Sequence, residues 1–443
     1  MGRVRFYLDR RLLLLALSGL LVMSVKAQDT LRLSLDEAVG IALSQNPTII
    51  VAGQEIELKK EVLKEAYAGL FPEVSLAGSY TRNVKIQKIS IMDEVVEMGT
   101  KNNYVGGLNI SLPVYAPALY KSIGLSKTDV ELAVEKSRSS KLDMVNQVAK
   151  AYYQLLLAQD SYDVLQKAYA QSEESYHVIN AKYEQGLASE YDKISAEVQW
   201  RSYKPSVVSA ANAVNLTTMQ LKVLMGLDPE KQIGVKGNLK DYEMEMFRQQ
   251  LNGDSLNLHN NTDLRQLDFN ALMLKQNLKL QRTNFLPSLA FSFNYGYSSM
   301  NNDFKFSNYE WFPNSAAVFS LSIPLFKAGN FTKTKQTKIQ MIQLAQNRIN
   351  VERQLNMQVK SYQDSMDAST EQVVSNKTAM LQAQKGRDIA SKRYDVGKGT
   401  VLELNSSEVA LTQAQLTYNE SIFDYLIAKA DLDKVLGNNK YIK

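Results

Sequence analysis

The sequence contains no cysteine in its 443 residues, and it has only two histidines, His177 and His259. The absence of cysteine excludes disulfides, thiolate metal sites, a cysteine nucleophile and a lipid-modified cysteine behind an export signal. The two histidines stand more than 80 residues apart and lack carboxylates at metal-ligand spacing, so each is expected to be a surface or packed side chain. No glycine-rich phosphate loop occurs either. The sequence therefore predicts no enzyme activity, no cofactor and no metal site.

Long apolar runs are confined to the N-terminus. Four arginines within the first eleven residues are followed by an apolar run over residues 12–25 and by Val25-Lys26-Ala27. This order of basic region, apolar region and cleavage site predicts a signal peptide over residues 1–27. The alternative is an uncleaved membrane anchor, but the apolar run is short for a bilayer and the polar Gln28-Asp29-Thr30 follows it. No later segment approaches the roughly 20 apolar residues of a membrane helix, which argues against an inner-membrane transporter.

Positive charge is also sparse outside this segment. Residues 1–27 hold five basic residues and one acid, so they account for most of the net charge of +5 and leave about +1 for the rest. No basic stripe with interleaved aromatic residues remains that could bind nucleic acid. The sequence therefore predicts no nucleic-acid partner.

Proline is rare over two long stretches. From Ala118 the chain continues for about 65 residues without proline, and apolar residues at 3,4 spacing mark a coiled-coil seam, formed by Leu142, Val145, Ala149, Tyr152 and Leu156. Such a helix is on the order of 100 Å long, which no compact globule holds. We predict a long helix over 117–184, a reversal at Tyr183-Glu184-Gln185-Gly186 and a return helix over 190–226. Pro205 is expected to kink the return helix.

Two shorter helices and two strands precede the long helix. Ser34-Leu35-Asp36-Glu37 is typical of a capping box, and helices are expected over 34–46 and 48–69. After Pro72 the period changes to two, with an apolar and aromatic face opposite a face of Ser, Gly, Ala and Asn. This alternation predicts strands over 73–82 and 103–112, joined by a polar loop.

The second half of the sequence follows the same plan. Its expected elements are a helix over 262–285, strands over 288–298 and 315–323, a long helix over 328–395 and a return helix over 401–436. Pro113 and Pro324, Gly186 and Gly397, and Gly226 and Gly437 are each 211 residues apart, whereas Pro72 and Pro287 are 215 apart. The difference falls in the hairpin loop, where insertions are tolerated. We expect two repeats, over 28–226 and 262–437, a linker over 227–261 that packs outside the helical bundle, and a tail over 438–443.

The four strands are too few to close a barrel. A strand of about ten residues with strict alternation fits an outer-membrane barrel whose apolar face meets lipid, and a soluble sheet with one wet face would carry more charge on its polar side. Barrels need about eight strands, because open edges leave backbone groups unsatisfied in lipid. The chain must therefore combine with copies of itself. Three copies give twelve strands and two copies give eight, and the sequence leaves both counts open.

The chain resembles the TolC-type outer membrane factor family over nearly all of its length after residue 27. The resemblance rests on two strand ends and two helix reversals, Ser111-Leu112-Pro113-Val114-Tyr115, Ser322-Ile323-Pro324-Leu325-Phe326-Lys327-Ala328-Gly329, Tyr183-Glu184-Gln185-Gly186-Leu187 and Tyr394-Asp395-Val396-Gly397-Lys398-Gly399-Thr400. It implies a mixed fold, with a twelve-stranded outer-membrane β-barrel completed by a homotrimer and continuous with a coiled-coil α-helical barrel in the periplasm. It also implies an exit duct of an efflux or secretion system, closed at its periplasmic end until an inner-membrane RND or ABC pump and a periplasmic adaptor engage it.

The resemblance also implies roles for residues at the helix reversals. Gly186 and Gly397 match the reversal glycines, where a positive φ favours glycine. Leu187 and Lys398 match positions that touch the adaptor's helical hairpin. Gly399 belongs to the same docking segment, although it stands where a latching arginine is expected.

Four residues are assigned to the latch and the aperture at the closed end. Tyr183 and Tyr394 belong to the latch, and Tyr394 matches a tyrosine that helps to hold it closed. Asp192 matches an acid of the latch network, and Glu403 matches the first of two acids that ring the aperture, where three copies would attract cations. Ser406 stands where the second aperture acid is expected. The alternative for Asp192 and Glu403 is an ordinary acid near a helix N-terminus, stabilised by the helix dipole.

Two functions remain in competition. The favoured one is a passive exit duct, whose cargo the sequence does not reveal. The alternative is a structural or adhesive coiled-coil trimer with a small barrel anchor, which explains the long helices but not the internal duplication.

Overall fold

The computed structural model describes residues 31–91, 94–248 and 257–442. The expected signal peptide over 1–27 lies outside these residues. The described chain forms two compact units, which we call the reversal unit and the sheet unit. The reversal unit holds the described parts of 1–42, 148–245 and 373–423, and the sheet unit holds those of 43–147, 246–372 and 424–443. Each unit contains segments from both halves of the sequence. The two compact units therefore do not correspond to the two expected repeats.

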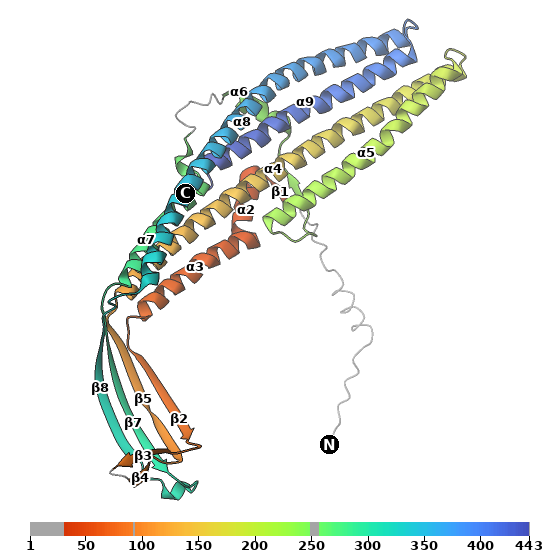
Figure 1. Cartoon of the computed structure of the whole chain (residues 1–443). Coiled ribbons are helices and arrows are strands. Elements are labelled where there is room, and N and C mark those ends of the chain that lie inside the picture. The colour runs from red at the N-terminus through yellow and green to blue at the C-terminus, as the bar shows by residue number, and fades with distance from the viewer. Residues whose placement is uncertain (1–30, 92–93, 249–256, 443) are drawn as a thin grey trace, which may run out of the picture. The chain divides into compact units, whose positions relative to one another are not determined.

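The sheet unit contains a four-stranded antiparallel sheet. Its strands lie in the order β2 (Glu73–Arg82), β5 (Asn102–Tyr115), β7 (Ser288–Asn301) and β8 (Phe312–Ser322), as Figure 1 shows. One row of side chains runs across the sheet from Leu76 to Leu108 and Tyr295. Among the described strands, β2 and β8 each pair with a single neighbour, so the sheet has two open edges.

The ends of three strands differ from the sequence-based prediction. β5 continues through Pro113 to Tyr115, with a register shift between these two residues. A bulge accommodates proline because proline has no backbone N–H to donate to the ladder. β7 extends to Asn301, and β8 begins at Phe312 instead of residue 315. Pairing therefore continues beyond the segment of strict alternation.

The expected polar loop between β2 and β5 contains a second hairpin. It consists of β3 (Gln87–Ile91) and β4 (Glu94–Met98), which pair antiparallel. Ile89 lies opposite Val96, and Lys88 forms an ion pair with Glu97 at 3.3 Å. The sequence indicated only a polar loop here and did not reveal the hairpin, because strands of five residues contain too few alternating positions to be recognised.

The helices follow the predicted plan closely. They are α2 (Leu35–Gln45), α3 (Pro47–Ala68), α4 (Pro117–Glu184), α5 (Glu190–Met225), α7 (Thr262–Thr283), α8 (Ala328–Asp395) and α9 (Val401–Leu436). Both α4 and α8 have 68 residues, and both α5 and α9 have 36. The first and last residues of α8 and α9 each lie 211 residues after those of α4 and α5. α5 continues through Pro205, and the seam residues Leu142, Val145, Ala149, Tyr152 and Leu156 are buried.

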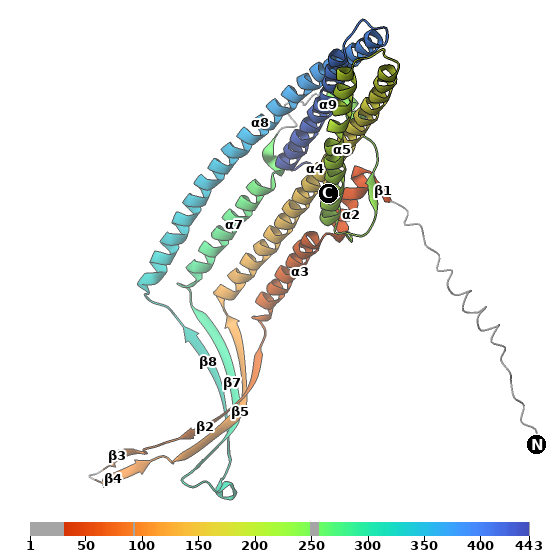
Figure 2. The same ribbon diagram turned by 90° about the vertical axis from the view of Figure 1, so that its right-hand side faces the viewer.

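The helices of the sheet unit lie side by side in the order α3, α4, α7, α8, which Figure 2 shows beside the strands. Ion pairs join neighbouring helices, from Lys59 to Asp129 at 3.1 Å and from Arg348 to Asp268 at 2.7 Å. Among the described residues, no helix is both long enough and apolar enough to cross a membrane.

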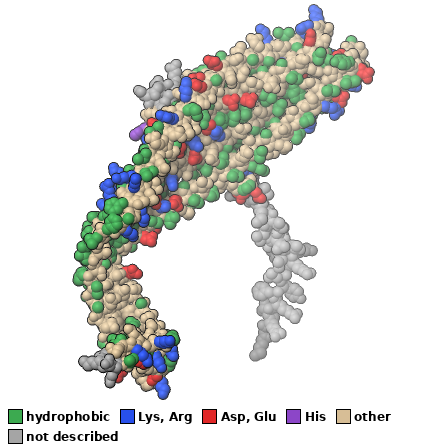
Figure 3. Space-filling model, viewed as in Figure 1, with side chains coloured by type: hydrophobic (Ala, Val, Ile, Leu, Met, Phe, Trp, Pro, Cys, Tyr) green, Lys and Arg blue, Asp and Glu red, His purple; other side chains and the backbone are tan. Residues whose placement is uncertain are grey.

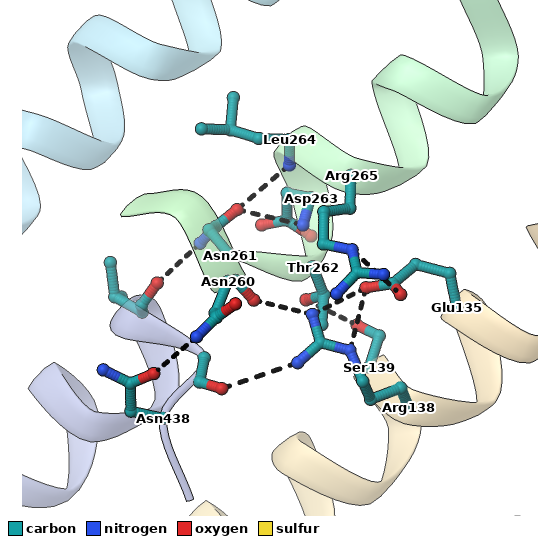
Figure 4. Close-up of polar contacts among 12 residues, drawn as sticks. Glu135, Arg138, Ser139, Asn260, Asn261, Thr262, Asp263, Leu264, Arg265 and Asn438 are labelled. Carbon is teal, nitrogen blue, oxygen red and sulfur yellow. Dashed lines mark hydrogen bonds and ion pairs between the residues drawn. The ribbon is translucent and has the colours of Figure 1, made fainter. Parts of the chain in front are cut away.

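A buried polar cluster joins α4, the start of α7 and the end of α9 within the sheet unit (Figure 4). The Glu135 carboxylate lies 2.7 Å from Arg138 and 3.4 Å from Arg265. Arg138 also donates to the carbonyl oxygen of Asn260 at 2.6 Å. Gly437 ends α9 with a φ of +67°, and a Cβ there would collide with the Asn260 carbonyl. Both the positive φ of Gly437 and its close approach to Asn260 therefore favour glycine at the end of α9.

In the reversal unit, the segment between α5 and α7 contributes elements that the sequence did not reveal. β1 (Leu31–Leu33) pairs in parallel with β6 (Ile233–Val235), and the Tyr152 hydroxyl lies 3.1 Å and 2.8 Å from the carbonyl oxygens of Leu33 and Lys236. The short helix α6 (Glu243–Arg248) begins at Glu243. The carboxylate of this residue accepts hydrogen bonds from Lys377 at 2.8 Å and from Tyr418 at 3.0 Å. Glu243 therefore binds this segment to both α8 and α9.

Candidate functional site at the helix reversals

Both helix reversals are built by the same local motif. Gly186 has a φ of +74° and Gly397 a φ of +71°. In the first reversal, the N–H of Leu187 donates to the Lys182 carbonyl at 2.8 Å and the N–H of Gly186 donates to the Tyr183 carbonyl at 2.9 Å. This pair of bonds is the Schellman motif, and the second reversal repeats it at the equivalent residues. An added Cβ would meet nothing within 4 Å at either glycine, so glycine is favoured by its conformation alone.

Each return helix begins with a capping box. The Ser189 hydroxyl accepts from the N–H of Asp192 at 3.1 Å, and the Asp192 carboxylate accepts from the N–H of Ser189 at 3.2 Å. Thr400 and Glu403 make the same two bonds at 3.2 Å and 3.3 Å. Both acids therefore stabilise their own helix N-termini, as the alternative interpretation of the sequence proposes. Their roles in a latch and an aperture concern an assembled tube and remain predictions.

Lys182 connects the two reversals. Its Nζ lies 3.3 Å from Asp395 Oδ1 and 4.9 Å from the centre of the Tyr394 ring. The Tyr394 ring packs against a small core of Ile179, Ala196 and Val401, so all four long helices meet here. The role of Lys182 has no signal in the sequence, because a single lysine near a helix end does not indicate its partner.

The Tyr394 hydroxyl has no hydrogen bond to Asp192 in the part of the chain that the structure describes. Burial raises the pKa of Tyr394, and the charges of Asp192 and Asp395 raise it further. The Asp192 carboxylate therefore lies near enough to interact electrostatically with the tyrosine. The two predicted latch residues are neighbours, while the direct polar contact to Tyr394 comes from Lys182.

The remaining predicted residues make contacts within one reversal. Lys193 lies 5.0 Å from the centre of the Tyr183 ring. Arg393 lies 3.8 Å from Glu403 Oε2 and donates to the Lys398 carbonyl at 3.1 Å. Leu187 is 74% exposed, and Lys398 is also exposed. The predicted docking residues are thus available at the surface of the reversals.

A groove of about 500 Å³ runs between the first turns of α5 and α9. Its lining includes Asn405, which donates to the Ser195 hydroxyl at 3.2 Å, and Ser406, the residue expected in place of a second aperture acid. The other lining residues are mostly exposed apolar side chains, Tyr191, Ile194, Val198, Leu402, Val409 and the polar Gln199. Their spacing of three and four residues is the sequence signal by which this groove could be found.

Across the described residues, no group of three or more histidines, aspartates and glutamates could hold a metal ion. The polar groups of the reversals are used instead for helix caps and for contacts between helices.

Comparison with known proteins agrees with this geometry. A family model described as outer membrane efflux protein matches residues 38–227 and 255–438. The chain belongs to the outer membrane efflux protein family. The resemblance that the strand ends and reversals predict is thereby confirmed, and with it the assignment to an efflux channel of the outer membrane.

Similar proteins match the chain along most of its length. Outer membrane protein TolC of Vibrio cholerae is 21% identical over 412 residues, which cover 91% of this chain and 90% of that protein. The probable efflux pump outer membrane protein TtgC of Pseudomonas putida is 23% identical over 426 residues, covering 92% and 84%. The first relative is named as an outer membrane protein and the second as the outer membrane protein of an efflux pump, which fits the prediction of no catalytic activity.

Solved structures support the fold. The outer membrane protein VceC of Vibrio cholerae superimposes with a TM-score of 0.70 at 16% identity, covering 91% of this chain and 96% of that one. The CmeC outer membrane channel of Campylobacter jejuni also gives a TM-score of 0.70, at 19% identity with 91% and 85% coverage. At these identities the likeness supports the mixed fold of this family member and no finer property.

Proposed function

We propose that the chain is one subunit of a homotrimeric outer-membrane exit duct in a tripartite efflux or secretion system. An inner-membrane pump and a periplasmic adaptor would deliver the cargo to the helical part in the periplasm. The adaptor would dock at the two reversals, near Leu187 and Lys398, and the cargo would leave through a barrel made from the strands of all subunits.

The observation that carries this proposal is the pair of open sheet edges. β2 and β8 each have one strand neighbour within the described chain, and an unpaired edge is costly in lipid because its backbone groups have no partner. Three successive antiparallel pairings make β8 run opposite to β2. The β8 strand of one copy can therefore pair antiparallel with the β2 strand of the next, so that identical subunits can close a ring.

The side chains of the sheet support a lipid environment. Leu76 is 83% exposed on β2, and Phe319 and Leu321 are 69% and 63% exposed on β8. Aromatic rings gather at the end of the sheet remote from the helices, where Tyr80 stacks on Tyr104 with 4.7 Å between ring centroids. An apolar band with aromatic residues at its edge is typical of membrane barrels.

The test is reconstitution of the detergent-purified chain in planar bilayers, combined with a mass measurement of the protein in detergent. We expect three copies and a small conductance that rises when Asp192 and Glu403 are both changed to alanine. Because these changes also remove capping-box bonds, Glu37→Ala is the matched control. Glu37 forms a capping box with Ser34 at the start of α2, with bonds of 2.7 Å and 3.3 Å, and its loss should leave the conductance unchanged.

Three results would contradict the proposal in different ways. A folded monomer that is soluble without detergent would exclude the barrel. A trimer that inserts but does not conduct would favour a structural or adhesive coiled-coil protein. An unchanged conductance in the double variant would remove the aperture assignment and leave the duct intact.

A further inference from the structure

Seven cations gather in the sheet unit where α7 ends and α8 begins. They are Lys275, Lys279 and Arg282 on α7, and Lys327, Lys333, Lys335 and Lys338 at the start of α8, and we call them the basic collar. All seven side chains are exposed. In the described part of the chain none of them forms an ion pair. Figure 3 shows Lys and Arg side chains grouped over this end of α7 and α8, beside hydrophobic ones.

The two helix ends form one surface. The side-chain amide of Asn330 on α8 donates a hydrogen bond at 3.2 Å to the carbonyl oxygen of Asn284, the residue that follows α7. The rings of Phe285 and Phe331 pack with their centroids 4.9 Å apart. The cations of both helices therefore act on the same region of solvent.

Acidic residues are missing from this part of the chain. Between residues 269 and 351 the only acids are Asp303 and Glu310. Both lie between β7 and β8, whereas the collar flanks the other ends of these strands, where Ser288 pairs with Ser322. The corresponding surface of the first half is balanced, because Lys60 pairs with Glu57 at 2.8 Å and Lys64 with Glu61 at 2.7 Å.

The collar is electrostatically unfavourable within the chain itself. α8 has no acid in its first turn, where Lys327 just before the helix opposes the helix dipole, whereas Arg282 in the last turn of α7 is favoured by the dipole of its own helix. Like charges on neighbouring helices also repel one another. A surface of this kind is stabilised by an anionic partner.

The position of the collar indicates which kind of anion it binds. Arg282 lies six residues before β7, and Lys327 lies five residues after β8. Exposed apolar side chains lie among the cations, with Leu325 at 93%, Phe326 at 80% and Phe331 at 58% exposure. Cations interleaved with aromatic residues beside a membrane span are typical of the membrane–water interface, where lipid headgroups carry negative charge.

We propose that the basic collar binds the phosphate headgroups of anionic phospholipids in the membrane leaflet next to the helices. This inference rests on the proposed function, in which the sheet spans the outer membrane. The cations hold the headgroups, and Phe326 and Phe331 reach the adjoining acyl region. The collar thereby fixes the depth of the sheet in the bilayer, which a chain without cysteine cannot do through a cysteine-linked lipid.

A second copy of the chain is the competing occupant. In the helix order of the sheet unit, α3 lies at the end opposite to α8, so the glutamates of α3 could face the collar of a neighbouring copy. Three of the four glutamates of α3 are already engaged, since Glu55, Glu57 and Glu61 pair with lysines of their own helix. Glu65 alone does not balance seven cations. The unpaired charge on α8 therefore favours lipid.

The test compares lipids by thermal unfolding of the full mature protein in a neutral detergent. Phosphatidylglycerol should raise the unfolding midpoint of the wild-type protein more than phosphatidylcholine does, and inorganic phosphate should not. The variant Lys275→Gln with Lys279→Gln should need about tenfold more phosphatidylglycerol for the same shift. The matched control is Lys60→Gln with Lys64→Gln, which lie 215 residues earlier and should behave as wild type.

Three outcomes would overturn the lipid site. These are equal shifts with both lipids, an equal loss in the matched control, and dissociation of the Lys275→Gln, Lys279→Gln oligomer in lipid-free detergent. The last result would assign the collar to a contact between copies. Oligomer mass and conductance are measured separately, so a failure of the exit duct is distinguishable from a failure of the lipid site.

Discussion

At the scale of single residues, the two reversals are equivalent in sequence but differ in their contacts. Lys182 and Arg393 are separated by the 211-residue offset, yet Lys182 reaches across to Asp395 while Arg393 stays beside Glu403. A Cβ at Gly399 would lie 3.1 Å from Arg393 Cβ and 3.2 Å from Glu403 Oε2. The glycine that stands in place of the expected arginine therefore leaves room for the Arg393–Glu403 pair.

Glu408 is a buried acid beside this site. One carboxylate oxygen accepts from the Ser175 hydroxyl at 3.1 Å and lies 4.0 Å from Arg387, whereas the other is buried without a hydrogen-bond partner among the described residues. Burial raises the pKa of Glu408, and Ser175 and Arg387 oppose this effect only in part. A carboxylate with a raised pKa destabilises the folded state when it is ionised.

Glu408→Gln should therefore raise the thermal unfolding midpoint at pH 7, by about 1–2 °C in a chain of this length. In the wild-type protein, the stabilising contribution of this group is present below its unfolded-state pKa and is lost as the pH rises through the raised folded-state pKa. The advantage of the variant should consequently shrink toward pH 4, where the wild-type carboxyl is largely protonated in both states. The measurement is the unfolding midpoint of both proteins between pH 4 and pH 8.

The exposed Glu174, on the same stretch of α4 as Ser175, supplies the control. Glu174→Gln removes the same charge without a buried carboxylate, so its midpoint should follow that of the wild type at every pH. A Glu408→Gln midpoint that is lower than wild type at pH 7 would show that the ion pair with Arg387 outweighs the burial of the charge.

At the scale of helices and strands, the sequence predicted what local chemistry determines. The reversals at Gly186 and Gly397 were found because a left-handed residue after a helix favours glycine. The capping boxes at Ser189 and Thr400 fix the following helix starts in the same local way. The end of β5 was misplaced because strand ends depend on a partner strand, and the bulge after Pro113 has no local signal.

Contacts between helices could not be predicted from the sequence either, and those of Lys182 are the clearest example. Lys182→Gln removes its ion pair with Asp395 and its contact with the Tyr394 ring, which together join the end of α4 to the end of α8. An exposed pair of this kind contributes a factor of about two, or about eight over the three coupled subunits of the proposed trimer. We expect the conductance of the resting channel in planar bilayers to rise by up to that factor.

Lys193 provides a matched comparison for Lys182. It makes the same type of contact with Tyr183 at nearly the same distance, 5.0 Å, but within a single reversal. Lys193→Gln should leave the resting conductance unchanged. The effect of Lys182→Gln should also shrink at 1 M salt, where the Debye length is about 3 Å. Equal effects of both variants would mean that surface charge, and not the link between reversals, controls the conductance.

At the scale of the whole molecule, the number of copies is the property that a single chain does not determine. The alternation of the strands indicates a lipid-facing sheet, and in the proposed barrel its two open edges pair with strands of other copies. Eight strands from two copies and twelve from three both satisfy every backbone group of the edges. The absence of cysteine makes the count measurable, because any cysteine that is introduced has no natural competitor.

A chain with one cysteine on each edge strand should decide the count. We expect Ser75→Cys on β2, combined in turn with Ala316→Cys, Val318→Cys or Ser320→Cys on β8, to form disulfides between copies at the matching register. Pairing within one chain is excluded, because β5 and β7 lie between the edges and three strand spacings amount to about 14 Å, twice the reach of a disulfide. After oxidation in the membrane, a denaturing gel should show monomer, dimer and trimer and nothing larger. Chains with only one of the cysteines should stay monomeric, and a ladder that ends at the dimer would replace the twelve-stranded barrel with an eight-stranded one.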